Sequence, residues 1–143
     1  MSRREEAIAA VVTLVTAALP LALVVRNQER ADEIGGGGFV NIIDGDPGDP
    51  EITLSPLTYT YDHPIGLELA AIGSADMTKE QALDAMGAAI GRAVAADRTL
   101  GNIVEFAQVT ALNTDNANAA GTDTIRWGDG AVIVQYTTKS PMG

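Results

Sequence analysis

Apolar residues recur at three- and four-residue spacing between Thr78 and Val94, which is the period of one face of a helix. Thr78 and Gln81 have the spacing of a capping box, in which each side chain bonds a backbone N–H of the first turn. An apolar helical stripe must be covered by other structure. We therefore expect a central helix that packs on a sheet through Leu83, Met86, Ile90, Ala93 and Val94.

Runs of β-favouring residues supply that sheet on both sides of the central helix. They span residues 21–25, 39–43, 57–61, 65–72, 103–112 and 131–138. Asp62, His63 and Pro64 separate two of these runs, and Asp and Pro favour turns, so residues 54–72 are expected to form a hairpin with its turn there. Residues 127–130, Trp-Gly-Asp-Gly, are expected to form a turn into the last strand.

Residues 7–25 contain no charged side chain and allow more than one interpretation. Ser2 with Glu5 has capping-box spacing, and Pro20 cannot continue a helix, so we expect a helix from Arg3 to about Ala18. The alternative is a membrane span or a cleaved export signal, because the run reaches the lower limit for spanning and arginines precede it. The N-terminal helix and the central helix together predict an α+β fold. Its mixed or antiparallel sheet of about four to six strands is covered by these two main helices.

Both helices carry small or apolar residues on a second face. The N-terminal helix is apolar nearly all round, which is typical of a helix buried on more than one side. The central helix has Gly87 and Gly91 one turn apart, and each glycine costs about 1 kcal/mol of helix stability relative to alanine. Either these glycines are neutral on a solvated face, or a second backbone, such as that of a neighbouring subunit, approaches closely.

The composition limits the classes of function. The 143 residues are expected to form one domain, 1–143, with mobile loops at 26–38, 44–51 and 113–124. Nineteen acidic residues against nine basic ones give a net charge of −10, which argues against a protein that grips duplex DNA or RNA through phosphates. The same charge suits a wall past which DNA moves without sticking. The chain has no cysteine, so thiolate chemistry is excluded.

Three segments could carry chemistry, and each has a simpler explanation. The glycines at 35–38 precede a strand, whereas phosphate-binding loops precede a helix. The acidic segment 44–51 could bind calcium, but its residues do not follow the EF-hand order and suit a solvated turn. His63 beside Asp62 could form half of a catalytic dyad, yet no serine has the Gly-x-Ser-x-Gly elbow. We therefore expect no enzyme activity, no cofactor and no metal; the alternative is a small soluble α/β enzyme or ligand-binding domain.

The order of predicted elements is helix, strand, strand, hairpin, helix, strand, long polar loop and strand. This pattern resembles the tail terminator (tail completion) proteins of long-tailed bacteriophages of the lambda-like group. The C-terminal third carries the closest likeness: Leu100-Gly-Asn-Ile-Val104, the Asp- and Asn-rich loop 113–124, Ile125-Arg-Trp127 and the terminal strand 131–137. The resemblance implies a structural virion protein at the head–tail junction, assembled in the host cytoplasm. Another head–tail connector subunit is the alternative within this class.

The resemblance also implies partners. Such a protein forms a homo-oligomer, a hexameric ring, which caps the tail tube protein and stops its polymerisation. Its other surface meets a neck or head-completion protein, and DNA passes through the lumen without specific binding. No membrane partner is expected. The expected subunit interface comprises Ile8, Val11, Leu14, Val15, Gly87 and Gly91, and the expected tube or lumen loops contain Asp44, Asp46, Asp49, Asp115 and Asp123.

Overall fold

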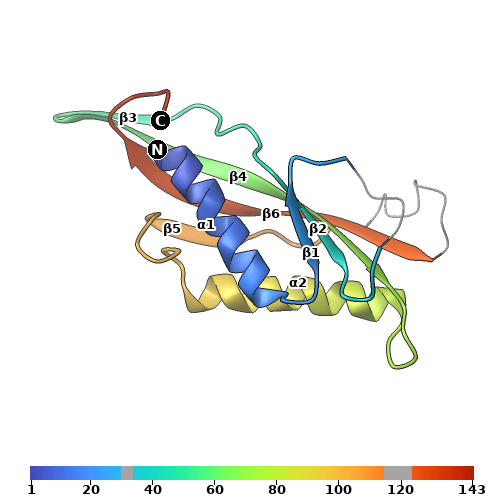
Figure 1. Cartoon of the computed structure of the whole chain (residues 1–143). Coiled ribbons are helices and arrows are strands. Elements are labelled where there is room, and N and C mark those ends of the chain that lie inside the picture. The colour runs from blue at the N-terminus through green and yellow to red at the C-terminus, as the bar shows by residue number, and fades with distance from the viewer. Residues whose placement is uncertain (30–33, 115–123) are drawn as a thin grey trace.

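The computed structural model describes residues 1–29, 34–114 and 124–143, and it has two helices on one mixed sheet (Figure 1). The elements in chain order are α1 (Arg3–Ala18), β1 (Leu23–Arg26), β2 (Phe39–Ile43), β3 (Glu51–Leu54), β4 (Leu57–Ile72), α2 (Lys79–Ala96), β5 (Phe106–Val109) and β6 (Ile125–Thr138). The strand order is β1-β2-β4-β6-β5, and β3 pairs with the first part of β4. Only β1 and β2 are parallel among these pairs. The expected α+β fold with two main helices is confirmed.

Both helices cover the same face of the sheet. Successive strand residues point to opposite faces, and in β4 the odd-numbered positions from Tyr61 to Leu69 are buried. Their partners on β2 and β6, such as Val40 and Val134, share this face. One apolar core joins it to both helices through Ala7, Ile8, Val11, Val15, Leu83, Met86, Ile90 and Val94. The molecule therefore has one helix layer and one sheet layer.

The helix ends follow the local sequence. The Thr78 hydroxyl accepts from the N–H of Gln81 at 3.1 Å, and the Gln81 side chain accepts from the N–H of Thr78 at 3.0 Å, so the expected capping box is present. The Ser2 hydroxyl accepts from the N–H of Glu5 at 3.1 Å at the start of α1. In the described parts of the chain, neither helix combines the length and the hydropathy that a membrane crossing requires.

The predicted hairpin turn at Asp62–Pro64 is wrong. β4 runs unbroken through these residues, and the hairpin turn lies instead between β3 and β4, at Ser55 and Pro56. The carbonyl of Pro64 faces the loop after β2, and the N–H and C=O of one strand residue point to the same side. On that side the pairing of β4 with β3 ends at Thr60 and its pairing with β2 begins at Gly66. Pro64 lies between the two partner strands, so the N–H that proline lacks is not needed there.

The predicted turn at residues 127–130 is also wrong, because these residues lie inside β6, paired with β4. A Cβ atom on Gly128 would come within 3.0 Å of Leu112 and 3.2 Å of Leu83. The small residue is needed where α2 and the segment after β5 approach the strand, which is a common reason for glycine inside a sheet. The strand predicted at 103–112 shortens to β5, and residues 98–103 form turns.

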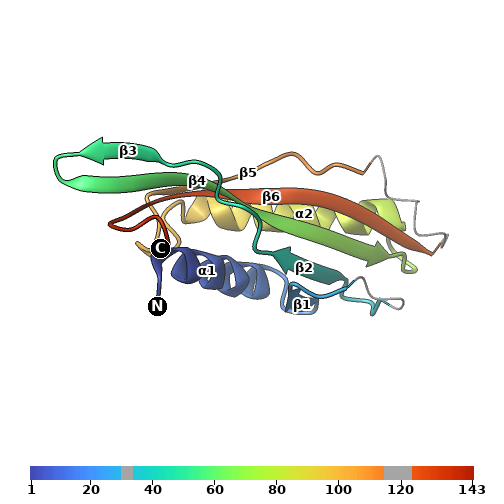
Figure 2. The same cartoon turned by 90° about the horizontal axis from the view of Figure 1, so that it is seen from above.

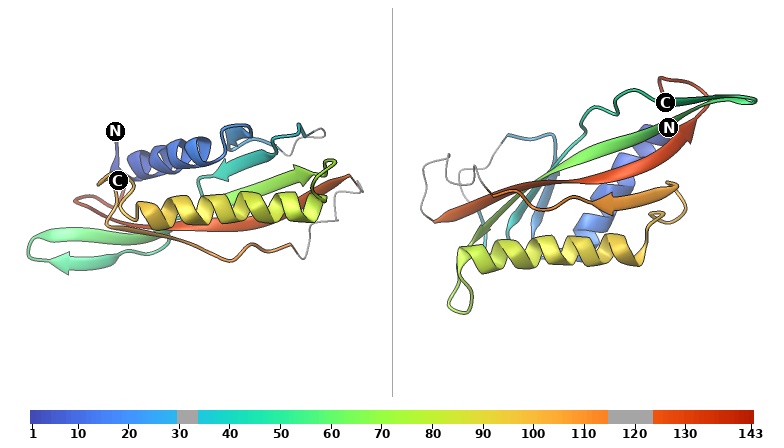
Figure 3. Two further views of the ribbon diagram at one scale, coloured as in Figure 1. Left: turned by 90° about the horizontal axis from the view of Figure 1, so that it is seen from below. Right: turned by 180° about the vertical axis from the view of Figure 1, so that it is seen from behind.

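The hairpin of β3 and the start of β4 projects past the helix layer (Figure 2). We call residues 51–60 the arm. All four residues of β3 are exposed, and the view from below shows the arm beyond the ends of both helices (Figure 3). The two termini meet at the base of the arm (Figure 1).

Candidate functional site

On the sheet face opposite the helices, the described strand residues include acidic side chains but no basic one. The even-numbered residues of β4 and their partners on neighbouring strands point to this face, which we call the open face. Among the described strand residues on it, the charged ones are all acidic, and they are Glu51, Asp62, Glu68 and Asp129. The other strand residues on it are threonine, glutamine and small residues together with large apolar ones such as Phe106 and Trp127. The carboxylates on this face can repel a polyanion.

Hydrogen bonds fix the polar side chains of the open face. The hydroxyls of Thr60 and Thr137 are 2.9 Å apart, and the Thr137 hydroxyl donates to the Glu105 carboxylate beside β5. Gln135 donates to Asp62 at 3.2 Å. This wall is therefore ordered, and Glu105 adds a fifth carboxylate to it.

The two edges of the open face differ from its centre. Beside β5, the Arg98 guanidinium lies 5.3 Å from the centre of the Phe106 ring and donates to the carbonyl of Ala107 at 3.0 Å. At the opposite end, Phe39 and Trp127 pack edge to face in a small apolar cluster, with their ring centres 5.9 Å apart. The acidic surface thus occupies the middle of the sheet and the arm.

His63 lies in the core, where it is 0% exposed, and not at a hairpin turn as the sequence predicted. Its Nδ1 is 2.9 Å from the Tyr136 hydroxyl, and its Nε2 is 2.5 Å from the carbonyl oxygen of Asp44. Burial lowers the pKa of His63 and raises the pKa of Tyr136 to about 12. The neutral tautomer that donates from Nε2 and accepts at Nδ1 satisfies both contacts. Asp62 points to the other face, so the two residues form no dyad.

Asp44 belongs to an ion-pair network that joins the first helix to the sheet. The Arg26 guanidinium donates to Asp44 at 2.6 and 2.9 Å and to Glu5 at 2.6 and 2.9 Å. These charged hydrogen bonds lower the pKa of both carboxyls and raise that of Arg26. Two bidentate pairs on one guanidinium hold the start of α1 beside the end of β1.

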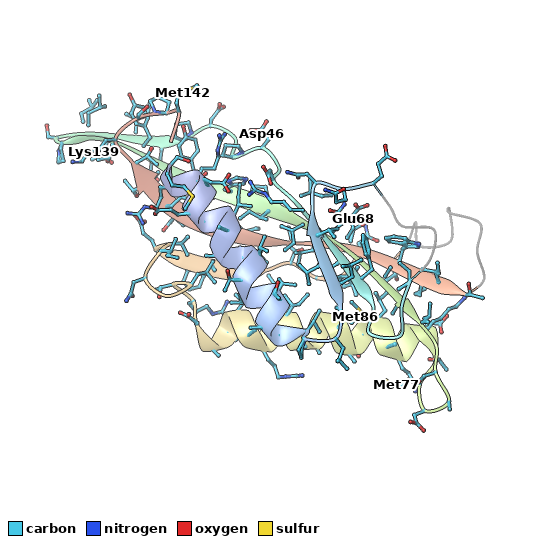
Figure 4. The ribbon with its side chains drawn as sticks, in the orientation of Figure 1. Asp46, Glu68, Met77, Met86, Lys139 and Met142 are labelled. Atoms are coloured by element: carbon cyan, nitrogen blue, oxygen red, sulfur yellow. The ribbon has the colours of Figure 1, made fainter. Side chains whose placement is uncertain are left out.

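The other acidic loop positions are less constrained. Asp46 accepts from the N–H of Gly48 at 2.8 Å, and Asp49 is exposed. Asp46 stands out from the loop above the sheet (Figure 4). Asp115 and Asp123 lie outside the described residues. Within the part of the chain that is described, no three His, Asp or Glu side chains meet in a way that could hold a metal ion.

The glycines of α2 face the molecule's own chain. A Cβ on Gly87 would lie 3.5 Å from Leu112, and one on Gly91 would lie 3.9 Å from Val109. Gly87 also borders a hollow of about 180 Å³ between α2 and the β5 segment. Both glycines therefore have neighbours within their own chain at ordinary contact distance, and their place in a subunit interface stays a prediction.

The residues expected at an interface on α1 divide into two groups. Ile8, Val11 and Val15 are 0–1% exposed and pack in the chain's own core. Leu14 instead borders an open apolar groove of about 670 Å³ between α1, the end of α2 and the turn that follows it. The α1 side of this groove is formed mainly by small residues, namely Ala9, Ala10, Thr13, Ala17 and Ala18. The apolar second side of α1 that the sequence indicated is this groove.

Sequence reasoning missed the acidic open face and the arm. The acidic face arises because residues far apart in the chain fall in the same phase of paired strands, and the register must be known to see this. No protein-family model matches this chain. A search of curated proteins likewise found no similar sequence.

Proposed function

We propose that this chain is a structural virion protein, a tail terminator that forms a ring on the end of a bacteriophage tail tube and lets DNA pass through its lumen. The observation that carries the proposal is the open sheet face, on which the charged strand residues are all acidic. A channel wall for DNA must not hold phosphate, and fixed carboxylates raise the electrostatic cost of contact.

The order of elements agrees with the resemblance on which the proposal is based. Two helices lie on one face of the sheet, and among the described residues no helix lies on the other. A subunit of this kind can point its open face toward the centre of a ring and its helices outward. The ring would stop growth of the tail tube and join the tail to a neck protein.

An enzyme that uses His63 has less support. The imidazole of His63 is buried in the core, and both of its nitrogens are within hydrogen-bonding distance of protein atoms. A general base must reach the proton that it removes. His63 instead ties the loop after β2 to the centre of the sheet.

The test is a tube-capping experiment. The purified chain is mixed with its cognate tail tube protein during tube polymerisation, and tube lengths are measured by negative-stain electron microscopy. We expect shorter tubes that carry a ring with an open centre at one end. Tubes of unchanged length without bound chain would overturn the proposal. Serum albumin at the same concentration controls for nonspecific effects on polymerisation.

A further inference from the structure

The arm has two chemically different faces. On β3, Ile52 and Leu54 are 54% and 78% exposed, and they pair across the hairpin with Tyr59 and Leu57. The other face of the arm carries Glu51, Thr53, Thr58 and Thr60. Opposed residues of paired strands share a face, so four large apolar side chains form one stripe.

This stripe continues the face that the helices cover. Leu57 and Tyr59 have the same phase in β4 as Tyr61, His63 and Ile65, which are buried under the helix layer. The helix layer ends at the base of the arm (Figures 2 and 3). The C-terminal tail reaches only that base, where the Tyr61 hydroxyl donates to the carbonyl of Pro141 at 3.0 Å, and Lys139 and Met142 lie at the same end (Figure 4). The arm is therefore sheet surface that lacks its helix.

The groove on α1 is the opposite case, a helix surface on which no sheet packs in the described parts of the chain. Val11 and Val15 pack against the chain's own core, whereas Leu14 and the small residues around it line the groove on another side of the helix. Small side chains let a sheet approach a helix closely. β4 runs unbroken from the core into the arm, so the arm cannot fold back to fill the groove of its own chain without breaking the strand.

We propose that the arm of one copy packs its apolar face into the α1 groove of a second copy. A second copy fits both surfaces, because the contact repeats the helix-on-sheet packing of the core and every copy carries one arm and one groove. Two different patches make a heterologous contact, which closes into a ring or continues as a filament. This inference rests on the self-assembly that the proposed function requires. It does not depend on the position of the protein in the phage tail.

Matched substitutions test the contact. Leu54→Glu on the arm and Thr13→Glu in the groove should each raise the dissociation constant of the assembly by at least about tenfold. Thr53→Glu, on the polar face of the same strand, and Thr16→Glu, outside the residues that line the groove, should leave it unchanged. Sedimentation velocity gives the constants, and circular dichroism checks that each variant is folded. Assembly of Leu54→Glu equal to that of the unchanged chain would overturn the proposal.

Cross-linking tests which surfaces meet. The chain has no cysteine, so Leu54→Cys and Thr13→Cys each introduce a single thiol. A short thiol-reactive cross-linker should join the two variants when they are mixed and should join neither to itself. Linkage of Leu54→Cys to itself would show an arm–arm contact, and a chain that stays monomeric with and without tail tube protein would exclude this contact; either result overturns the proposal.

The two proposals fail separately. Rings that depend on Leu54 but do not cap tubes would overturn the tail function and leave the arm contact standing. Capping of tubes by Leu54→Glu with the activity of the unchanged chain would overturn the arm contact alone.

Discussion

His63 and Gly45 meet where the loop after β2 crosses β4. The His63 ring binds the carbonyl of Asp44, and Gly45 follows with a φ of +70°. A Cβ on Gly45 would lie 2.4 Å from the backbone oxygen of Pro64. The loop can therefore approach the strand closely only with glycine at this position.

The loss of stability in Gly45→Ala, compared with that in Gly48→Ala, tests how closely the loop approaches the strand. Gly48 has nearly the same φ, +72°, but a Cβ there would meet no atom within 4 Å. Gly48→Ala should cost about 1 kcal/mol from backbone strain alone. Gly45→Ala should cost about 1–3 kcal/mol more, because a backbone atom must move. Urea unfolding of both variants gives the difference, and equal losses would contradict the close approach.

The pH dependence of stability should report the burial of His63. Because its pKa in the folded chain is below the ordinary 6.5, the unfolded chain takes up a proton first as the pH falls. The free energy of unfolding should therefore be fully maintained above about pH 6.5 and fall below it, with a slope of at most about 1.4 kcal/mol per pH unit.

A variant separates this effect from that of the carboxyls. His63→Gln should lose the dependence that begins near pH 6.5, whatever its own stability. The lowered pKa values of Glu5 and Asp44 produce a second loss of stability, in the same direction, at pH values below the ordinary 4.5 and 3.8. Urea titrations from pH 8 to 5 lie above that second range. An unchanged dependence in His63→Gln would mean that other groups cause it.

At the scale of elements, the helices were predictable and the strand limits were not. The ends of α1 and α2 depend on local signals, chiefly Ser2 and Thr78 as caps. β4 and β6 contain residues typical of turns, Pro64 and Gly128, which the sheet accommodates for reasons found only in three dimensions. Pro64 faces the gap between two partner strands, and Gly128 makes room for Leu112.

Substitution of glycine by alanine should change the stability of the chain in opposite directions at Gly91 and Gly128, because their surroundings differ. At Gly91 a Cβ would make an ordinary contact, 3.9 Å from Val109, so Gly91→Ala should stabilise the chain by about 0.5–1 kcal/mol through helix propensity. Gly128→Ala should destabilise it, because the Cβ would crowd Leu112 and Leu83 at 3.0–3.2 Å. Thermal unfolding measures both. Destabilisation by Gly91→Ala would mean that α2 and β5 lie closer together at Gly91 than this contact distance indicates.

At the scale of the whole molecule, the two faces of one sheet differ in chemistry. The sequence indicated an acidic protein and placed the acidic surface in loops. The structure adds a wall of carboxylates on the strands, from Glu51 on the arm to Asp129 near the other end of β6. Composition predicts the net charge, whereas only the strand register collects the carboxylates on one face.

Reversal of charge on that wall tests whether its acidity is what keeps DNA from binding. The unchanged chain should not retain DNA even at low salt. A double variant, Asp62→Lys with Gln108→Lys, places two cations on the open face and should bind duplex DNA. Its affinity should fall as the salt concentration rises, with a log–log slope of about −0.9 per phosphate contacted.

The control variant, Thr16→Lys with Ala85→Lys, places two cations at exposed positions in the helix layer. This control raises the net charge by two units rather than three, so Asp62→Asn with Gln108→Lys provides a variant of the open face with the same net charge as the control. Fluorescence anisotropy with a labelled duplex, supported by images of the rings, should show binding from the open face alone. Equal binding by the control would mean that total charge, and not its position on a channel wall, decides whether DNA passes freely.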